Sequence, residues 1–231
     1  EDTFLELDIY SHPRVVKASK GNYEGIGIII ATGWPKNNSK KIIGEKEFTG
    51  NGVSYCATCD GFFTKGRITS VFGNGHEAVE EALFLTKHAK EINVFCDKDD
   101  LEVEAELKEQ LLSNENVKLF TNAKLLEVLG NQYVEKVKVD IAGEIKEMES
   151  DFAFLYLGTK SNSELYQGFA KLNDEGYIIT DENMACEVEG VWAAGDIRER
   201  TVRQVTTAVA DGTLAGIEAI KYVMKKKREV K

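Results

Sequence analysis

Residues 68–78 read ITSVFGNGHEA, and this stretch decides the fold class of the chain. An apolar run typical of a buried strand ends at two glycines, and an amphipathic helical pattern begins directly after them. The segment fits G-x-G-x-x-A, in which the first glycine permits a tight turn, the second lets backbone approach a pyrophosphate, and the small third residue lets the helix pack closely. The pattern predicts a dinucleotide-binding turn; the alternative is a turn of this shape that binds no ligand. Its residues are Gly73, Asn74, Gly75, His76, Glu77 and Ala78.

Beyond this turn the sequence continues as alternating strands and helices. We expect helices over 77–90 and 101–112, strands at 92–95, 117–120 and 152–157, and antiparallel strands between 124 and 149. The antiparallel strands are predicted to meet at a turn formed by Ala142-Gly143. The fold class is therefore α/β: a Rossmann-like three-layer nucleotide-binding domain with an antiparallel β-meander, over about 42–160.

The two ends of the chain carry pieces of a second domain. The expected pieces are a buried strand in GIGIIIATG (25–33), a hairpin-like EGYIITD (175–181), a strand ending in Gly-Asp in VEGVWAAGDI (188–197), and a helix over about 205–226. Neither end is large enough to form an α/β domain alone. We therefore expect the middle domain to be inserted into an incomplete outer domain, with segments 1–41, 42–160 and 161–231.

Composition excludes several classes of function. The formal net charge of −10 argues against nucleic acid as the main partner, because phosphate binding needs a clustered basic face. The longest apolar run is far shorter than the ~20 residues of a membrane span, and the start of the sequence does not have the pattern of a signal peptide. We expect a cytoplasmic protein, without nucleic acid or membrane as partner. Four cysteines in 231 residues are too few for a disulfide-built scaffold.

The stretch SYCATCDG (54–61) places Cys56 and Cys59 three positions apart, with Asp60 directly after them. A zinc site would want a second Cys or His pair, and the remaining candidates show no ligand spacing, so we expect no metal. Two inert buried thiols are a further alternative. The pattern favours a redox-active dithiol in which Asp60 serves as the proton donor, and such chemistry calls for a flavin between a nicotinamide and the disulfide.

The end of the strand at 92–95 bears on which nucleotide would fit. An acid there accepts the ribose hydroxyls of NAD, whereas basic side chains accommodate the additional phosphate of NADP. The sequence after the strand contains Asp97, Asp99 and Asp100 with only Lys98 between them. We therefore expect NADH to be possible and NADPH to be disfavoured; the alternative is that this loop is a solvated acidic turn.

Taken together, these motifs resemble the low-molecular-weight thioredoxin reductases. The resemblance rests on CATCDG (56–61), GNGHEA (73–78) and GVWAAGDI (190–197) followed by Arg203-Gln204, and it covers essentially the whole chain in the family's order. It implies that FAD and nicotinamide-nucleotide domains are interleaved. It also implies a thioredoxin-like disulfide protein as partner, a homodimer, and rotation of the nucleotide domain about linkers near 34–41 and 158–163.

The resemblance assigns roles by position. Cys59 would face the flavin, Cys56 would attack the partner disulfide, and Asp60 would donate the proton. Asp97 and Gly158 would lie at the nicotinamide nucleotide. The residues implied at FAD are Thr32, Gly33, Gly195, Asp196, Arg203, Gln204, Val205 and Ala208.

The sequence departs from the family at two places. No segment before residue 25 matches the G-x-G-P-A-G-like turn for the ADP half of FAD, so we expect a fragment, or a sequence from which the N-terminal part is missing, that holds FAD poorly alone. The family's His-Arg-Arg-x-x-x-Arg clamp for NADPH is replaced by CDKDDLE (96–102). The electron donor is then NADH or, alternatively, a ferredoxin-like protein. A non-catalytic redox-sensing module that binds a dinucleotide is the alternative from another class.

Overall fold

The computed structural model describes residues 2–33, 42–158, 163–166 and 168–229. The chain divides into two units, Glu1–Pro35 with Thr159–Lys231, and Lys36–Gly158. Each is described by itself below. The predicted linkers at 34–41 and 158–163 fall largely outside the described residues, and the segment boundaries at 41 and 160 fall wholly outside them, so both stay predictions.

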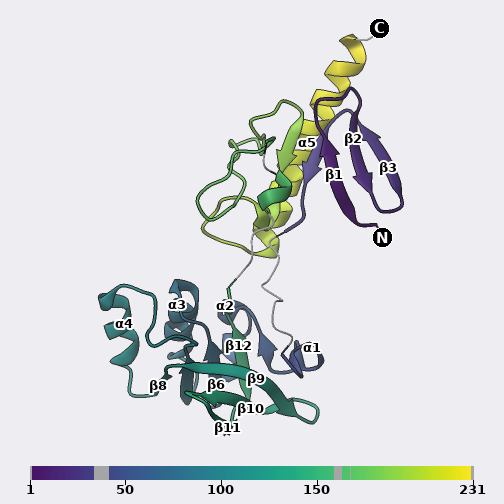
Figure 1. Cartoon of the computed structure of the whole chain (residues 1–231). Helices are drawn as coiled ribbons and strands as arrows, with labels where there is room; N and C mark the ends of the chain where they lie inside the picture. The colour runs from purple at the N-terminus through teal and green to yellow at the C-terminus, as the bar shows by residue number, and fades with distance from the viewer. Residues whose placement is uncertain (1, 34–41, 159–162, 167, 230–231) are drawn as a thin grey trace. The chain divides into compact units, whose positions relative to one another are not determined.

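The unit Lys36–Gly158 is built on a parallel sheet of five strands in the order β5-β12-β6-β7-β8 (Figure 1). The strands are β5 (Val53–Ser54), β6 (Ile68–Phe72), β7 (Glu91–Phe95), β8 (Val117–Phe120) and β12 (Phe152–Leu155). The strands β6, β7 and β12 are buried at every position but the first, as parallel strands covered on both faces are, and most of their side chains are apolar. The strands predicted at 92–95 and 117–120 are thus confirmed, and the strand predicted at 152–157 is confirmed but ends at Leu155.

Two helices cover one face of this sheet: α3 (His76–Leu85) and α4 (Ala105–Leu112). Both are shorter than predicted. Helix α3 ends at Leu85 because the N–H groups of Lys87 and His88 bond three residues back rather than four. Helix α4 begins at Ala105 and not at Leu101, since the N–H of Glu102 donates to the carbonyl of Asn74 and holds that segment against the glycine turn.

The antiparallel meander forms the third layer on the opposite face (Figure 1). Its strands are β9 (Ala123–Gly130), β10 (Val134–Ile141) and β11 (Glu144–Glu149), in the order β11-β10-β9. The turn between β10 and β11 is the predicted Ala142-Gly143, and both residues have positive φ (52° and 91°), as a two-residue hairpin of this type requires. The rings of Phe72, Phe95 and Phe120 stack beneath the meander with centroids 4.7 and 5.0 Å apart. The predicted three-layer α/β fold is confirmed.

Three short helical segments complete this unit: α1 (Glu45–Phe48), α2 (Ala57–Asp60) and the 3-10 turn η1 (Gly61–Thr64). None was predicted, because four-residue helices carry no periodic apolar pattern.

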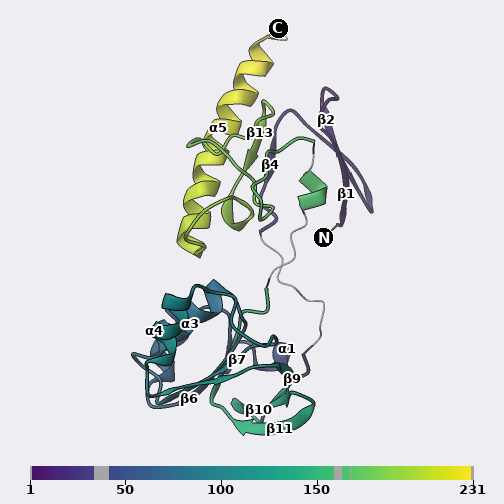
Figure 2. The same cartoon turned by 60° about the vertical axis from the view of Figure 1, so that its left-hand side comes forward.

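The second unit contains a two-stranded parallel sheet, β4 (Ile28–Ile30) with β13 (Val191–Ala193), and the long helix α5 (Val205–Glu229) (Figure 2). An antiparallel sheet of β1 (Phe4–Asp8), β2 (Arg14–Ala18) and β3 (Gly21–Gly25) precedes them, and the sequence did not reveal it. The 3-10 turns are η2 (Ser163–Tyr166) and η3 (Gly195–Ile197).

Two predictions in this unit need correction. The strand expected over 25–33 spans only Ile28–Ile30, since Gly25 closes β3 and Ile29 is 42% exposed. The hairpin-like segment expected at 175–181 forms no pair of strands within itself: Ile178 makes an antiparallel bridge to Leu172, before the segment, and a parallel bridge to Arg198. The strand at β13 and the helix at α5 are confirmed.

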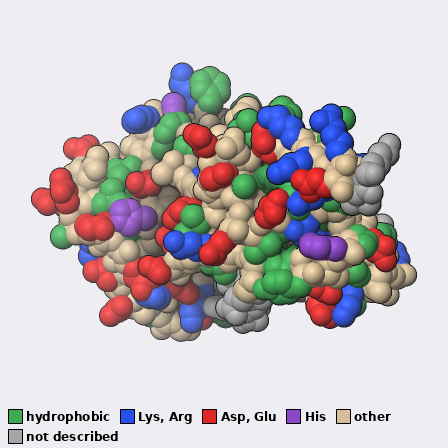
Figure 3. All heavy atoms as spheres, turned by 90° about the horizontal axis from the view of Figure 1, so that it is seen from above, with side chains coloured by type: hydrophobic (Ala, Val, Ile, Leu, Met, Phe, Trp, Pro, Cys, Tyr) green, Lys and Arg blue, Asp and Glu red, His purple; other side chains and the backbone are tan. Residues whose placement is uncertain are grey.

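The surface mixes both signs of charge. Figure 3 shows acidic and basic side chains interspersed over the face it presents. Within the described residues, no helix is both long and apolar enough to cross a membrane.

Candidate functional site

The two cysteines of the C-x-x-C motif lie at the start of α2. Cys56 is the N-cap of this helix, and its sulfur accepts the N–H of Cys59 at 3.2 Å. The sulfurs are joined in a disulfide whose Cα atoms lie 5.3 Å apart. Cys59 is exposed and Cys56 is half-buried, so an external thiol can reach the bond. Of the alternatives left open by the sequence, the redox-active pair is the one that fits this arrangement.

Asp60 is tied to the disulfide segment through a serine. The hydroxyl of Ser54 donates to Asp60 Oδ2 at 2.6 Å, and the Ser54 oxygen accepts the N–H of Cys56 at 3.2 Å. Asp60 also lines a cavity of about 590 Å³ whose wall includes the exposed ring of Phe63. The carboxylate thus lies within one residue of Cys59 and opens onto solvent-accessible space. Its role as proton donor stays a prediction.

A second carboxylate reaches the same segment from α3, and no pattern in the sequence predicted it. Glu81 Oε2 accepts the N–H of Ala57 at 2.8 Å, and the hydroxyl oxygen of Tyr156 accepts the same N–H at 3.1 Å. Burial, and secondarily the charge of Glu81, raises the pKa of the Tyr156 phenol well above its usual value. The phenol is therefore neutral at physiological pH. These partners are 24 and 99 positions away in sequence, beyond what local patterns can report.

The predicted dinucleotide turn joins β6 to α3. A Cβ atom on Gly73 would lie 2.5 Å from the carbonyl oxygen of Tyr156 and 2.8 Å from Cβ of Ala78, and φ of Gly73 is +151°. Ala78 is fully buried, as close packing of the helix on the strand requires. Gly75 has open space where its Cβ would be. The structure therefore brings the turn residues together in the expected shape, although their roles toward a ligand stay predictions.

A cavity of about 160 Å³ opens beside this turn, at the carboxyl ends of the parallel strands. Gly73, Asn74, Asp97, Lys124 and Leu157 contribute to its lining. In open α/β sheets, ligands bind at this edge.

The acidic loop beyond β7 is bonded to the turn and to itself. The amide of Asn74 donates to Glu102 Oε2 at 2.6 Å, and Glu102 also pairs with Lys98. Nε2 of His76 lies 2.5 Å from Glu104 Oε2. The polar side chains of the turn, Asn74 and His76, are therefore both bonded to acidic side chains.

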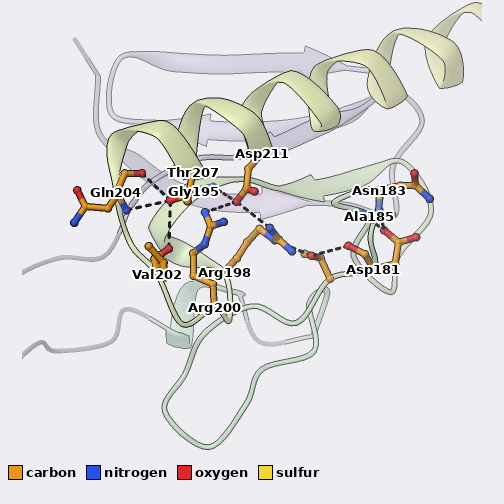
Figure 4. Close-up of polar contacts among 11 residues, drawn as sticks. Asp181, Asn183, Ala185, Gly195, Arg198, Arg200, Val202, Gln204, Thr207 and Asp211 are labelled. Atoms are coloured by element: carbon orange, nitrogen blue, oxygen red, sulfur yellow. Dashed lines mark hydrogen bonds and ion pairs between the residues drawn. The ribbon is translucent and has the colours of Figure 1, made fainter. Parts of the chain in front are cut away.

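The Gly195-Asp196 turn of the other unit is organised by a buried carboxylate. Asp211, on α5, accepts through Oδ2 the N–H of Gly195 at 3.0 Å and the guanidinium groups of Arg198 and Arg200 at 2.9 and 2.8 Å. Figure 4 shows the side chain of Asp211 pointing from the helix toward these partners. The sequence did not single out Asp211, which looks like one polar residue of a solvated helix.

The residues that resemblance assigns to FAD lie around this turn. Oδ1 of Asp196 is buried and has no hydrogen-bond partner among the described residues, so it is available to a hydroxyl group of a ligand. The Arg203 guanidinium lies 3.9 Å from the ring centroid of Tyr177. Thr32 Oγ1 and the Tyr166 hydroxyl are 2.6 Å apart. This donor and acceptor set fits a flavin nucleotide.

The remaining predicted residues are placed as follows. Gly33 and Gly158 have φ of +67° and +82°, with open space at each Cβ position. Ala208 contacts Gly195, whose added Cβ would lie 3.5 Å from that of Ala208. Gln204 donates its N–H to Thr207 at the start of α5, and Val205 is 78% exposed.

A Rossmann-like unit with a solvent-accessible C-x-x-C disulfide defines a class, the pyridine nucleotide-disulphide oxidoreductases. The model of that family matches residues 6–212. The chain is 40% identical over 233 residues to the thioredoxin reductase of Peptoclostridium litorale, covering 96% of this chain and 73% of that protein. It is 37% identical over 217 residues to that of Bacillus subtilis, covering 91% and 67%.

A solved structure agrees with these sequence matches. The thioredoxin reductase of Streptococcus pyogenes superposes with a TM-score of 0.88 at 31% identity, over 97% of this chain and 74% of that one. The chain therefore belongs to the pyridine nucleotide-disulphide oxidoreductase family and, within it, to the thioredoxin reductases. The family implies FAD as cofactor.

Proposed function

We propose that this chain passes electrons through FAD and the Cys56–Cys59 disulfide to a thioredoxin-like protein, and that NADH rather than NADPH is the reductant. The observation that carries the proposal is the accessible disulfide, held on one side by Ser54 and Asp60. FAD, when bound, supplies the transfer of electrons between a nicotinamide and the disulfide.

The chain's own residues account for the thiol chemistry. Reduction of the disulfide takes up two electrons and two protons and leaves two thiols. The Cys56 thiolate then attacks the partner disulfide to form a mixed disulfide. Cys59 attacks the Cys56 sulfur and displaces the partner sulfur, so that the partner leaves as a dithiol and Cys56–Cys59 forms again. Asp60 supplies the proton for the departing sulfur.

Docking of the partner is supported by the apolar surface beside the disulfide. Phe62 and Phe63 directly follow the CATCDG motif and are 70% and 66% exposed. Exposed aromatic rings next to a reactive group are typical of protein interfaces. Phe63 also borders the cavity that reaches Asp60, which would place a docked partner at the proton donor. A thioredoxin-like surface, apolar around its own cysteines, is the partner proposed.

Binding of FAD would use the residues around Gly195. The unpaired Oδ1 of Asp196 would accept a hydroxyl group of the cofactor, and Asp211 would hold the turn in place. Thr32, Gly33, Gln204, Val205 and Ala208 are proposed neighbours of the cofactor by position in the family. A homodimer and a cytoplasmic location remain predictions.

The preference for NADH is supported by charge at the nucleotide cavity. Asp97 lines it, and Glu102 bonds the turn through Asn74. A 2′-phosphate brought to this edge would meet carboxylates, and like charges at short range are unfavourable. NADH lacks this phosphate.

The test is a thioredoxin reduction assay with the FAD-loaded protein and NADH or NADPH as donor. We expect NADH to be preferred at least roughly tenfold, the cost of ~1.4 kcal/mol of repulsion. Equal rates with NADH and NADPH would contradict the proposed preference for NADH. Turnover with reduced ferredoxin but with neither nucleotide would show that a ferredoxin-like protein is the electron donor instead. The variant Cys59→Ser should lose thioredoxin reduction; if it kept full activity, the dithiol relay would be wrong.

A further inference from the structure

The main-chain N–H of Ala57 is a point at which three elements meet. Ala57 is fully buried and directly follows Cys56. Its N–H is shared by Glu81 Oε2 from α3, at 2.8 Å, and the hydroxyl of Tyr156 at the end of β12, at 3.1 Å. That hydroxyl donates in turn to Glu81 Oε2 at 3.3 Å. A carboxylate is thus bonded to the residue next to the more buried of the two sulfurs.

The Glu81 carboxylate takes part in none of the ion pairs among the described residues. The neighbouring titratable groups are Tyr156, a neutral phenol, and Glu77 on the same helix, whose charge also acts on Tyr156. From the other side, Asp60 reaches Cys56 through Ser54. The charged groups that these hydrogen bonds connect to Cys56 and Ala57 are therefore acidic.

We propose that Glu81 is a positioning residue that sets the acidity of the Cys56 thiol and, through it, the reduction equilibrium of the dithiol. Glu81 fixes the first turn of α2 by its bond to Ala57, and its negative charge disfavours the Cys56 thiolate. A thiol with a higher pKa forms less thiolate, but that thiolate is more nucleophilic. At pH values at which the thiols ionise, a higher thiol pKa also makes the dithiol a stronger reductant. The inference rests on the proposed redox role of the disulfide.

The direct test measures the pKa of the Cys56 thiol from the rate of alkylation by iodoacetamide over a series of pH values. The Cys59→Ser background leaves Cys56 as the accessible thiol, since Cys96 and Cys186 are buried. We expect Glu81→Gln, which keeps a hydrogen-bond acceptor but no charge, to lower this pKa by about one unit, a tenfold gain in thiolate below both pKa values. The matched control is Glu80→Gln, an exposed residue on the same helix, which should shift it by less than ~0.3 unit.

A second measurement uses the intact dithiol in equilibrium with dithiothreitol, in which two electrons and two protons pass from one dithiol to the other disulfide. Above both thiol pKa values, Glu81→Gln should make the dithiol tenfold less reducing, about 30 mV for a two-electron couple. Neither measurement needs FAD or thioredoxin. Failure of the proposed function and failure of this inference can therefore be told apart.

The outcomes are distinct. A Cys56 pKa in Glu81→Gln equal to the parent, or a shift no larger than that in Glu80→Gln, overturns the proposal. If Glu81→Gln does not fold, as shown by the absence of a cooperative urea transition, the same measurement is made on Glu81→Asp, which keeps the charge but withdraws the carboxylate from Ala57. A pKa of the Cys56 thiol in Glu81→Asp below that of the parent supports the proposal, and an unchanged pKa overturns it.

Discussion

Substitution by alanine should have different effects at the two glycines of the nucleotide turn: at Gly73 it should lower the stability of the fold, and at Gly75 it should weaken binding of the nucleotide. In Gly73→Ala the new methyl carbon would lie 2.5 Å from the carbonyl oxygen of Tyr156 and 2.8 Å from Cβ of Ala78, at a φ of +151°. Overpacking costs about 1–3 kcal/mol and a forced backbone conformation about 1–3 kcal/mol more. In Gly75→Ala the methyl group meets no protein atom within 4 Å. The expected loss of stability is about 3 kcal/mol or more for the first variant, and under about 1 kcal/mol for the second, which replaces the glycine at the N-cap of α3.

Urea unfolding and nucleotide titration together test this contrast. Gly73→Ala should lower the midpoint of unfolding strongly, by the equivalent of roughly 10 °C in Tm. Gly75→Ala should lower the midpoint far less but weaken binding of NADH, because its methyl group would occupy the space in which a pyrophosphate approaches the backbone. Equal midpoints for the two variants would refute the steric reasoning. Unchanged binding by Gly75→Ala would show that the ligand does not approach this turn.

Three further outcomes can be checked. Asp211→Asn should destabilise its unit by about 3–5 kcal/mol in urea unfolding, because two half-buried guanidinium groups lose their counter-charge; a loss under ~1 kcal/mol would count against it. Burial, with a hydrogen bond to Glu45, raises the pKa of Tyr55 from 10.0 to about 12, so the fold favours the neutral phenol. That stabilisation is complete below pH ~10 and falls as pH rises toward 12. Tyr55→Phe should reduce this pH dependence of the unfolding midpoint and leave the part that comes from Tyr156; an unchanged pH dependence would show that Tyr55 does not contribute. Asp60→Asn should slow thioredoxin reduction by about 100-fold while the disulfide still forms, and an unchanged rate would remove Asp60 from the mechanism.

Local chemistry explains what the sequence predicted well. The strand Val117–Phe120 and the turn Ala142-Gly143 depend on residues that are neighbours in sequence, so their patterns carry the signal. The turn at Gly73 was readable for the same reason, since strand, glycines and helix follow one another directly.

Most features that could not be predicted from the sequence depend on contacts between segments that are distant in the chain. Glu81 and Asp211 look like ordinary polar positions on helices, and only the folded chain brings them to Ala57 and Gly195. The start of α4 was placed too early because an apolar residue, Leu101, extends the helical pattern, whereas the following residue is bonded to the turn. The sheet β1-β2-β3 was missed because its strands alternate poorly between buried and exposed side chains. Phe62 and Phe63 could have been found, because two adjacent aromatic residues after CATCDG stand out in a polar segment.

Tyr156 touches both functional regions of its unit. Its backbone crowds Gly73, and its hydroxyl accepts the N–H of Ala57 beside Cys56. A ligand that displaces this residue at the nucleotide turn must also change the free energy of the dithiol segment. Thermodynamic linkage then requires reciprocity: whatever factor nucleotide binding imposes on the dithiol–disulfide equilibrium, the oxidation state of the cysteines imposes on nucleotide affinity. If a nucleotide binds at the Gly73 turn, its affinity would therefore depend, through Tyr156, on whether Cys56 and Cys59 are reduced.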